Sequence, residues 1–284
     1  MKKHVIIDTD TNNEADDQFA LSYLLKCKDL FYIDAITIAP YSHHRSRLTN
    51  VWESQDLSYD EAKRICNFLN VNSSIIYKGS NDYLVNNCNK TNDAVDKIIE
   101  VALKNDKTYI LAIAAITNIA LAIIKEPRII DKIEIIWLGG HQLDYENNLE
   151  YNFKQDIKAV KTIFESNVNL TVLPCNNVVS DLKISLDELK NNIENKSDLC
   201  NYLIDKFYND GYHGYTTDRI IWDIAVIAYM INKDWFEETV VDCPKIQDDT
   251  SYKKRRNKRK ISFVTKVNRD RIYKDLFTKL TGEL

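Results

Sequence analysis

Four aspartates near the N-terminus have the spacing to hold a metal ion. Asp8 and Asp10 end a short apolar run, and Asp16 and Asp17 follow after a five-residue spacer, so that five acidic side chains fall within ten residues. Carboxylates this close repel one another, and each buried one needs a partner. A hard divalent cation, Ca²⁺ or Mg²⁺, meets that need with oxygen ligands alone. The alternative, that Asp16 and Asp17 only stabilise a helix N-terminus, leaves Asp8 and Asp10 unexplained.

The elements around these aspartates predict an α/β fold. Short apolar runs that predict strands lie at 4–7, 33–39, 74–77, 108–114, 133–138 and 169–174. Segments of helical period lie between them, at 15–28, 59–69, 93–104, 118–125 and 157–165. Strands that are apolar on both faces and are followed by helices indicate a doubly wound, mostly parallel Rossmann-like sheet with helices on both faces. In such a sheet the turn that carries the aspartates lies at the carboxyl edge, where ligands bind.

After about Leu182 the pattern changes to a helical C-terminal portion. We expect helices at 185–193, 197–208, 219–231 and 269–280, and a hairpin near 252–266. Ser58 with Glu61 and Ser185 with Glu188 have the spacing of capping boxes at helix starts. Because no Pro/Gly-rich linker interrupts the chain, we expect one domain over 1–284, in which 183–284 completes the site of a 1–182 core.

Composition excludes several classes of protein. A chain of 284 residues with 44% hydrophobic residues can bury a large core, and its net charge of −4 argues against a nucleic-acid partner. The six cysteines form no Cys-x-x-Cys pair, so we expect reduced, mostly buried thiols. The most apolar stretch, 109–124, is shorter than the about 20 residues that span a bilayer, and the N-terminus does not fit a secretory signal. These features predict a cytoplasmic protein without a membrane partner. The basic run at 253–260 is either a solvated turn, which we favour, or a phosphate-binding patch.

Further segments follow the aspartates in a specific order. They are Ala114-Ala115-Ile116-Thr117-Asn118-Ile119-Ala120, Trp137-Leu138-Gly139-Gly140, Glu150-Tyr151-Asn152 with Asp156, and Arg219-Ile220-Ile221-Trp222-Asp223. Together with the aspartates they span residues 4 to about 230. Each segment is weak alone, but the ordered set resembles the inosine–uridine-preferring nucleoside hydrolases.

The resemblance implies the ligands of a bound Ca²⁺ ion. These are the side chains of Asp10, Asp17 and Asp223, the backbone carbonyl of Thr117, the 2′- and 3′-hydroxyls of a nucleoside and one water. Asp16, Glu150 and Asn152 would hydrogen-bond the ribose, and Asp8 would support the turn from behind. The family also suggests a homodimer or homotetramer.

The implied reaction is hydrolysis of the N-glycosidic bond to ribose and free base. Carboxylates around the sugar would stabilise an oxocarbenium-like transition state. Asp10 would act as general base toward the metal-bound water, whose pKa the ion lowers. Direct attack needs no covalent intermediate, so the ribose would be released with inverted configuration.

Three departures from the family pattern concern the substrate. The spacer between the aspartate pairs has five residues instead of three, which adds Asn13 and Glu14 as possible ribose contacts. Residues 39–44 replace the family's Gly-Asn and predict a substrate-covering loop to about Leu57, in which His43 is either a base contact or an exposed side chain. Trp222 stands where many members have a histidine; it can stack on the base but cannot protonate it. Candidates for that protonation are Tyr41, His43, His141, His213 and Tyr215.

Two other functions fit part of the pattern. A haloacid-dehalogenase-type phosphatase also begins with a strand ending in Asp-x-Asp, with Asp8 as nucleophile, but it leaves Asp16 and Asp17 unexplained. A non-enzymatic nucleoside- or ribose-binding protein on the same fold would bind nucleosides without releasing ribose. Release of reducing sugar from nucleosides separates these possibilities.

Overall fold

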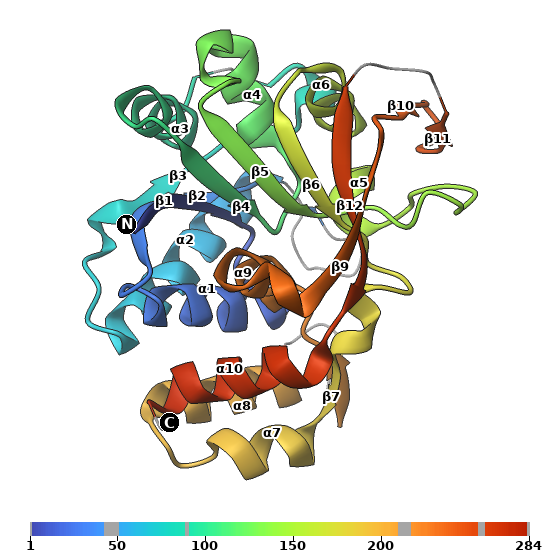
Figure 1. Cartoon of the computed structure of the whole chain (residues 1–284). Coiled ribbons are helices and arrows are strands. Elements are labelled where there is room, and N and C mark those ends of the chain that lie inside the picture. Colours follow the sequence, from blue (N-terminus) through green and yellow to red (C-terminus); the bar gives the residue numbers. More distant parts are fainter. Residues whose placement is uncertain (1, 43–50, 89–90, 210–216, 255–258, 283–284) are drawn as a thin grey trace.

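An eight-stranded sheet forms the centre of the molecule (Figure 1). The computed structural model describes residues 2–42, 51–88, 91–209, 217–254 and 259–282. The strands in spatial order are β3 (Ile76–Lys78), β2 (Phe31–Ile38), β1 (Lys3–Thr9), β4 (Thr108–Ala112), β5 (Ile133–Leu138), β6 (Asn169–Leu173), β12 (Lys260–Val267) and β9 (Phe236–Asp242). All neighbouring pairs are parallel except β12 with β9. The predicted doubly wound, mostly parallel fold is confirmed.

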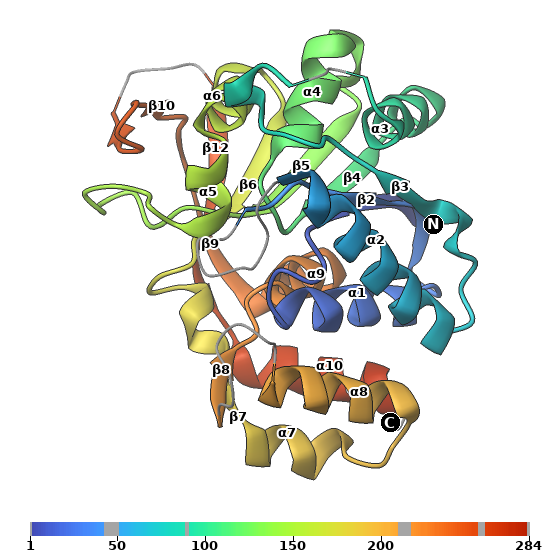
Figure 2. The ribbon, with the colours of Figure 1, turned by 180° about the vertical axis from the view of Figure 1, so that it is seen from behind.

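Helices cover both faces of this sheet (Figures 1 and 2). One face carries α3 (Asp93–Lys104), α4 (Thr117–Lys125) and α6 (Ile157–Glu165), and the other carries α1 (Asp16–Lys26), α2 (Val51–Phe68) and α9 (Ile224–Ile231). A further layer packs against α1 and consists of α7 (Leu186–Ile193), α8 (Asp198–Tyr208) and α10 (Arg269–Thr281). The short elements are α5 (Tyr151–Gln155), β7 (Lys183–Ser185), β8 (Asp218–Ile220), β10 (Lys245–Ile246) and β11 (Tyr252–Lys253).

Strand β1 illustrates why apolar runs become inner strands. Val5 and Ile7 pack into the hydrophobic core on one face of the sheet, while Ile6 packs into the core on the other. All three side chains are fully buried. A strand that buries both faces requires a helical layer on each side, and the alternating helices supply it.

Most predicted elements are close to those observed. Strand β5 and helices α3 and α6 have the predicted bounds. Ser185 caps α7, because its Oγ accepts a hydrogen bond from the Glu188 N–H at 3.1 Å. The predicted capping box at Ser58 is wrong, because helix α2 begins at Val51. Ser58 therefore lies in the middle of the helix, where it is buried. The predicted helix at 219–231 is also shorter, since β8 takes its first residues.

The predicted hairpin at 252–266 does not form. Strand β11 pairs with β10, whereas β12 lies in the main sheet between β6 and β9. Ile261 and Phe263 of β12 are buried in the core, and this non-local packing outweighs a local turn. The C-terminal portion therefore contributes two strands to the central sheet in addition to its helices. Residues 255–258 of the basic run lie outside the described residues, and Arg259 donates to the carbonyls of Phe164 and Val168, each at 2.7 Å.

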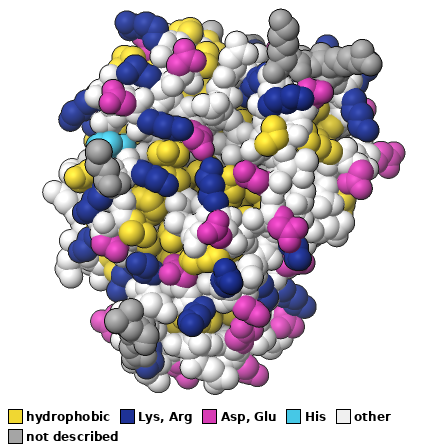
Figure 3. Space-filling model, in the orientation of Figure 1, with side chains coloured by type: hydrophobic (Ala, Val, Ile, Leu, Met, Phe, Trp, Pro, Cys, Tyr) yellow, Lys and Arg dark blue, Asp and Glu magenta, His cyan; other side chains and the backbone are white. Residues whose placement is uncertain are grey.

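The surface mixes both signs of charge. On the face shown in Figure 3, Lys and Arg side chains alternate with Asp and Glu side chains and do not gather into one patch. Within the described part of the chain, no helix combines the length and apolar character needed to cross a membrane. Five of the six cysteines are buried, as expected, and Cys88 is partly exposed.

Candidate functional site

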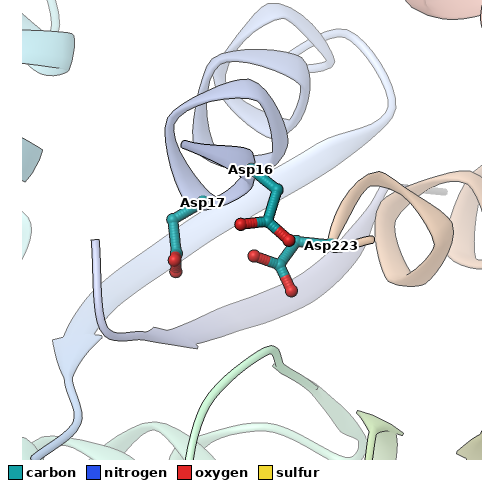
Figure 4. A group of neighbouring side chains, drawn as sticks. All are labelled: Asp16, Asp17 and Asp223. Atoms are coloured by element: carbon teal, nitrogen blue, oxygen red, sulfur yellow. The ribbon is translucent and has the colours of Figure 1, made fainter. Parts of the chain in front are cut away.

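The aspartates lie at the carboxyl edge of the sheet, in the turn that joins β1 to α1. Asp10 follows the last residue of β1, and Asp16 and Asp17 form the first turn of α1. Asp223 immediately precedes α9, which packs beside α1. Figure 4 shows the carboxylates of Asp16, Asp17 and Asp223 converging from these two helices. One oxygen from each of the three lies within 4.8 Å of the others.

These carboxylates line a cavity of about 200 Å³. Its lining consists of Asp10, Asn13, Glu14, Asp16, Asp17, Ile113, Leu138, His141, Glu150, Tyr151, Asn152, Cys175, Asn176, Trp222 and Asp223. Six of these side chains are acidic, and no Lys or Arg occurs among the described residues that line it. The cavity is therefore suited to a cation or to the hydroxyl groups of a neutral ligand.

Burial raises the pKa of each aspartate in the cavity well above its usual value. Neighbouring carboxylates raise these pKa values further. The charge of Asp16 raises the pKa of Asp10 and of Asp223, and the charge of Asp10 raises the pKa of Asp17. For Asp16, burial and then Glu14 raise the pKa, and a hydrogen bond from the Trp222 backbone opposes them. A divalent cation among these groups would remove the repulsion and keep them ionised. All of the donors are oxygens, which fits such an ion.

Hydrogen bonds hold two of these carboxylates in place. Asn13 Nδ2 donates to Asp10 Oδ2 at 2.9 Å, and Thr9 Oγ1 donates to Asp17 Oδ1 at 2.6 Å. Asn13 thus lines the cavity and also orients Asp10. The group of three carboxylates whose oxygens lie within 4.8 Å of one another contains Asp16, whereas the resemblance implies Asp10 in its place.

Asp8 is buried behind the cavity and is not among the residues that line it. Its Oδ1 accepts hydrogen bonds from Thr37 Oγ1 at 2.6 Å and from Asn118 Nδ2 at 2.9 Å. Asn118 also donates to the carbonyl of Ile38 at 2.9 Å. Asp8 therefore joins the carboxyl ends of β1 and β2 to the start of α4.

Thr117 is the first residue of α4, and Asp156 fixes its side chain. Thr117 Oγ1 donates to Asp156 Oδ2 at 2.8 Å, and the backbone N–H groups of Leu84 and Val85 donate to the same carboxylate at 2.6 and 3.1 Å. Thr117 is fully buried and is not among the cavity-lining residues. This network holds the α4 start in a fixed place beside β4.

Glu150 and Asn152 tie the strand ends to α5. Glu150 caps this helix and also accepts a hydrogen bond from the Gly140 N–H at 2.8 Å. Asn152 Nδ2 donates to the carbonyl of Leu138 at 3.0 Å, next to the end of β5. Gly140 has φ +72°, and a Cβ there would approach the Tyr252 hydroxyl to 2.5 Å. The turn after β5 therefore requires glycine.

The chain matches the family described as "inosine-uridine preferring nucleoside hydrolase" over residues 5–274. It belongs to this family. Residues 5–274 include every element that lines the cavity. Family membership also removes the phosphatase alternative.

Solved structures of nucleoside hydrolases share the fold. One from a plant superposes with a TM-score of 0.79 at 18% identity over 99% of both chains. The inosine-uridine preferring enzyme from Bacillus anthracis has a TM-score of 0.75 at 16% identity, over 99% of this chain and 100% of that one. A purine-preferring enzyme from Gardnerella vaginalis has a TM-score of 0.75 at 19% identity, over 99% and 98%. A search of curated proteins found no match.

The structure places some of the candidate substrate contacts at the cavity and others away from it. His43, His213 and Tyr215 fall outside the described residues. The expected loop to Leu57 is helical from Val51 onward, as part of α2. Tyr41 is buried and does not line the cavity, whereas Trp222, Glu14 and His141 do.

The sequence did not reveal three contacts that hold side chains at the site in place. Thr9 bonds Asp17, Asn118 bonds Asp8, and Asp156 bonds Thr117. Thr9 lies between the first two aspartates, so its position was a usable signal. The other two contacts join segments far apart in the chain, so they can be predicted only when the fold is known.

Proposed function

We propose that this nucleoside hydrolase cleaves the N-glycosidic bond of a nucleoside to ribose and free base with the help of a Ca²⁺ ion. Asp10, Asp17 and Asp223 would hold the ion by their side chains, and Thr117 by its backbone carbonyl. The observation that carries the proposal is the group of buried carboxylates in a cavity lined by no described cationic side chain. Ca²⁺ takes six to eight oxygen ligands with flexible geometry, which suits this donor set.

The bound ion would lower the pKa of the attacking water and hold the sugar diol. Asp10 would act as the general base that accepts the proton of that water. Its hydrogen bond with Asn13 fixes the carboxyl group for this role. Because the water attacks the sugar directly, the released ribose has inverted configuration.

Carboxylates around the sugar stabilise the transition state. Asp16, Glu150 and Asn152 line the cavity and would hydrogen-bond the ribose. As the base departs, positive charge develops on the ribosyl ring, and the fixed negative charges of Asp16 and Glu150 favour it.

Trp222 is the proposed contact for the nucleobase. It lines the acidic cavity and also an adjoining cavity of about 240 Å³, which Glu14 and Asp16 border as well. An indole on the wall of both cavities suits stacking on a planar base. We further propose a cytoplasmic homodimer or homotetramer that acts in nucleoside salvage; light scattering measures the assembly.

A nucleoside panel tests the proposed reaction. Inosine, uridine, adenosine, guanosine and cytidine are incubated with the enzyme in Ca²⁺, in Mg²⁺ and in EDTA, and base and reducing sugar are measured. We expect equal amounts of base and ribose from at least one nucleoside, with the highest rate in Ca²⁺ and none in EDTA. Ca²⁺-dependent binding without release from any nucleoside would instead identify a binding protein.

A further inference from the structure

Asn13 belongs to the five-residue spacer between the two aspartate pairs, and the turn that contains it has an unusual backbone. Asn12 has φ +113°, in a region that residues other than glycine seldom adopt. The Asn13 N–H donates to the carbonyl of Asp10 at 2.8 Å and closes the turn. Backbone strain of this kind persists only where other contacts hold the chain, and it is found most often at functional sites.

One end of the Asn13 amide has a partner and the other has none. Nδ2 donates to Asp10 Oδ2 at 2.9 Å. Oδ1 is buried and accepts no hydrogen bond from any residue that the structure describes, although Asn13 lines the acidic cavity. A buried acceptor without a donor destabilises the folded protein. We therefore expect Asn13 Oδ1 to take its donor from the contents of the cavity.

The geometry of the amide keeps Oδ1 near the Asp10 carboxylate. Nδ2 lies 2.9 Å from Asp10 Oδ2, and the nitrogen and oxygen of an amide are about 2.2 Å apart, so the two side-chain oxygens are at most about 5 Å from each other. A water molecule that donates to two acceptors at about 2.8 Å each requires them to be roughly 4.5 Å apart. One water molecule can therefore donate to Asp10 and Asn13 at the same time.

A nucleophilic water is oriented best when both of its O–H bonds are held. Attack on C1′ uses a lone pair of the oxygen, which faces the sugar when both hydrogens point away from it. Asp10 is the proposed acceptor of one hydrogen. A carboxamide oxygen accepts a hydrogen bond but is too weakly basic to remove a proton, so Asn13 suits the second hydrogen. This argument rests on the proposed function for the attacking water.

We propose that Asn13 accepts a hydrogen bond from the attacking water and, together with Asp10, orients that water toward C1′ of the nucleoside. The O–H bond that points at Asp10 breaks, its proton passes to Asp10, and the oxygen forms the new bond to C1′. The electron pair of the N-glycosidic bond leaves with the base, which takes up a proton from solvent. The O–H bond that points at Asn13 stays intact and becomes the anomeric hydroxyl.

Two variants separate a contact with the water from a contact with the sugar. Asn13→Leu keeps the volume of the side chain, and Asn13→Ala removes most of it. In saturating Ca²⁺ we expect either change to lower kcat about 10–100-fold. Binding of 1,4-anhydroribitol, which has the ring and the three hydroxyls of ribose but no substituent at C1′, should change less than about twofold. A tenfold or larger loss of that binding would identify a sugar contact and overturn the proposal.

Methanol separates a contact with the water from an effect through Asp10 alone. Methanol has one O–H hydrogen, which goes to Asp10, so its attack does not use Asn13. In mixtures of methanol and water we measure methyl riboside and ribose released from the same nucleoside, and we expect their ratio to rise at least about fivefold in both variants. Because one enzyme molecule forms both products, an unfolded fraction does not affect this ratio. An unchanged ratio, including no methyl riboside from any of the proteins, would contradict the proposal.

Asn86→Ala is the matched control. Asn86 Nδ2 donates to Asp82 Oδ1 at 2.8 Å, which is the same kind of contact at an exposed place outside the cavity lining. This variant should keep the kcat, the 1,4-anhydroribitol binding and the product ratio of the wild type. If the wild type releases no ribose from any nucleoside, the proposed function fails, and the role of Asn13 fails with it. If the wild type is active and both Asn13 variants keep its kcat within about twofold, only the role of Asn13 fails.

Discussion

Asp8 shows at the scale of one residue how the site separates structural from chemical carboxylates. It lies outside the cavity lining, and its hydrogen bonds reach Thr37 and Asn118. The resemblance to the family implied that Asp8 supports the turn. Its partners could not be predicted, since they come from other strands and helices.

The ionisation of Asp8 gives a prediction for pH. Burial raises its pKa to about 7, above the value near 3.9 of an unfolded chain, so the folded protein binds a proton that the unfolded chain has lost. The stability this supplies is complete below the unfolded pKa and is lost as pH rises through about 7. Asn in its place can accept the same two hydrogen bonds and does not titrate.

We expect the free energy of unfolding in EDTA to fall from pH 5 to pH 8, and to fall less in Asp8→Asn by about 2–3 kcal/mol. Urea unfolding at the two pH values measures the difference. The aspartates that line the cavity, whose pKa values burial also raises, keep part of the pH dependence of unfolding in both proteins. Equal slopes in wild type and Asp8→Asn would mean that Asp8 is already ionised in the folded protein.

At the scale of elements, local pattern predicted inner strands and amphipathic helices well. Strand β5 and helix α3 have the predicted bounds because their apolar periodicity and caps agree with their packing. Strand β9 was missed since most of its side chains are exposed. Strand β12 was misassigned because its partners, β6 and β9, are distant in sequence.

The turn between β5 and α5 gives a prediction at this scale. Gly140 and Gly282 have nearly the same positive φ, +72° and +74°, but only a Cβ at Gly140 meets a neighbour, the Tyr252 hydroxyl at 2.5 Å. We expect Gly282→Ala to cost about 1 kcal/mol from backbone strain alone, and Gly140→Ala to cost more.

Thermal unfolding and ribose release measure both effects. Because Gly140 also donates to Glu150, its replacement should lower activity, whereas Gly282→Ala should not. Equal losses of stability in the two variants would mean that the contact with Tyr252 does not constrain the turn.

At the scale of the whole molecule, the fold brings together carboxylates from distant parts of the chain. Asp16 and Asp17 belong to the N-terminal α1, and Asp223 precedes α9 in the C-terminal portion. A cation bound among them would link these two regions and stabilise the folded state by mass action.

The variant Asp223→Asn distinguishes the effect of carboxylate repulsion on the melting temperature from the effect of metal binding. It removes one buried charge, so we expect a higher melting temperature than the wild type in EDTA, by a few degrees. Added Ca²⁺ should raise the melting temperature of the wild type and leave that of the variant almost unchanged. Asp270→Asn, at a carboxylate that is 92% exposed, should behave like the wild type. A full Ca²⁺ response in Asp223→Asn would remove it from the proposed ligands.

Ribose release by Asp10→Asn is the most direct measurement of the central claim. Asn at this position keeps the size of the side chain but can neither ligate Ca²⁺ as an anion nor take the proton of the attacking water. With the nucleoside that the wild type cleaves fastest in Ca²⁺, we predict that kcat falls at least about a thousandfold while the variant remains folded. An Asp10→Asn enzyme that releases ribose at a rate close to that of the wild type would contradict the proposed catalytic site.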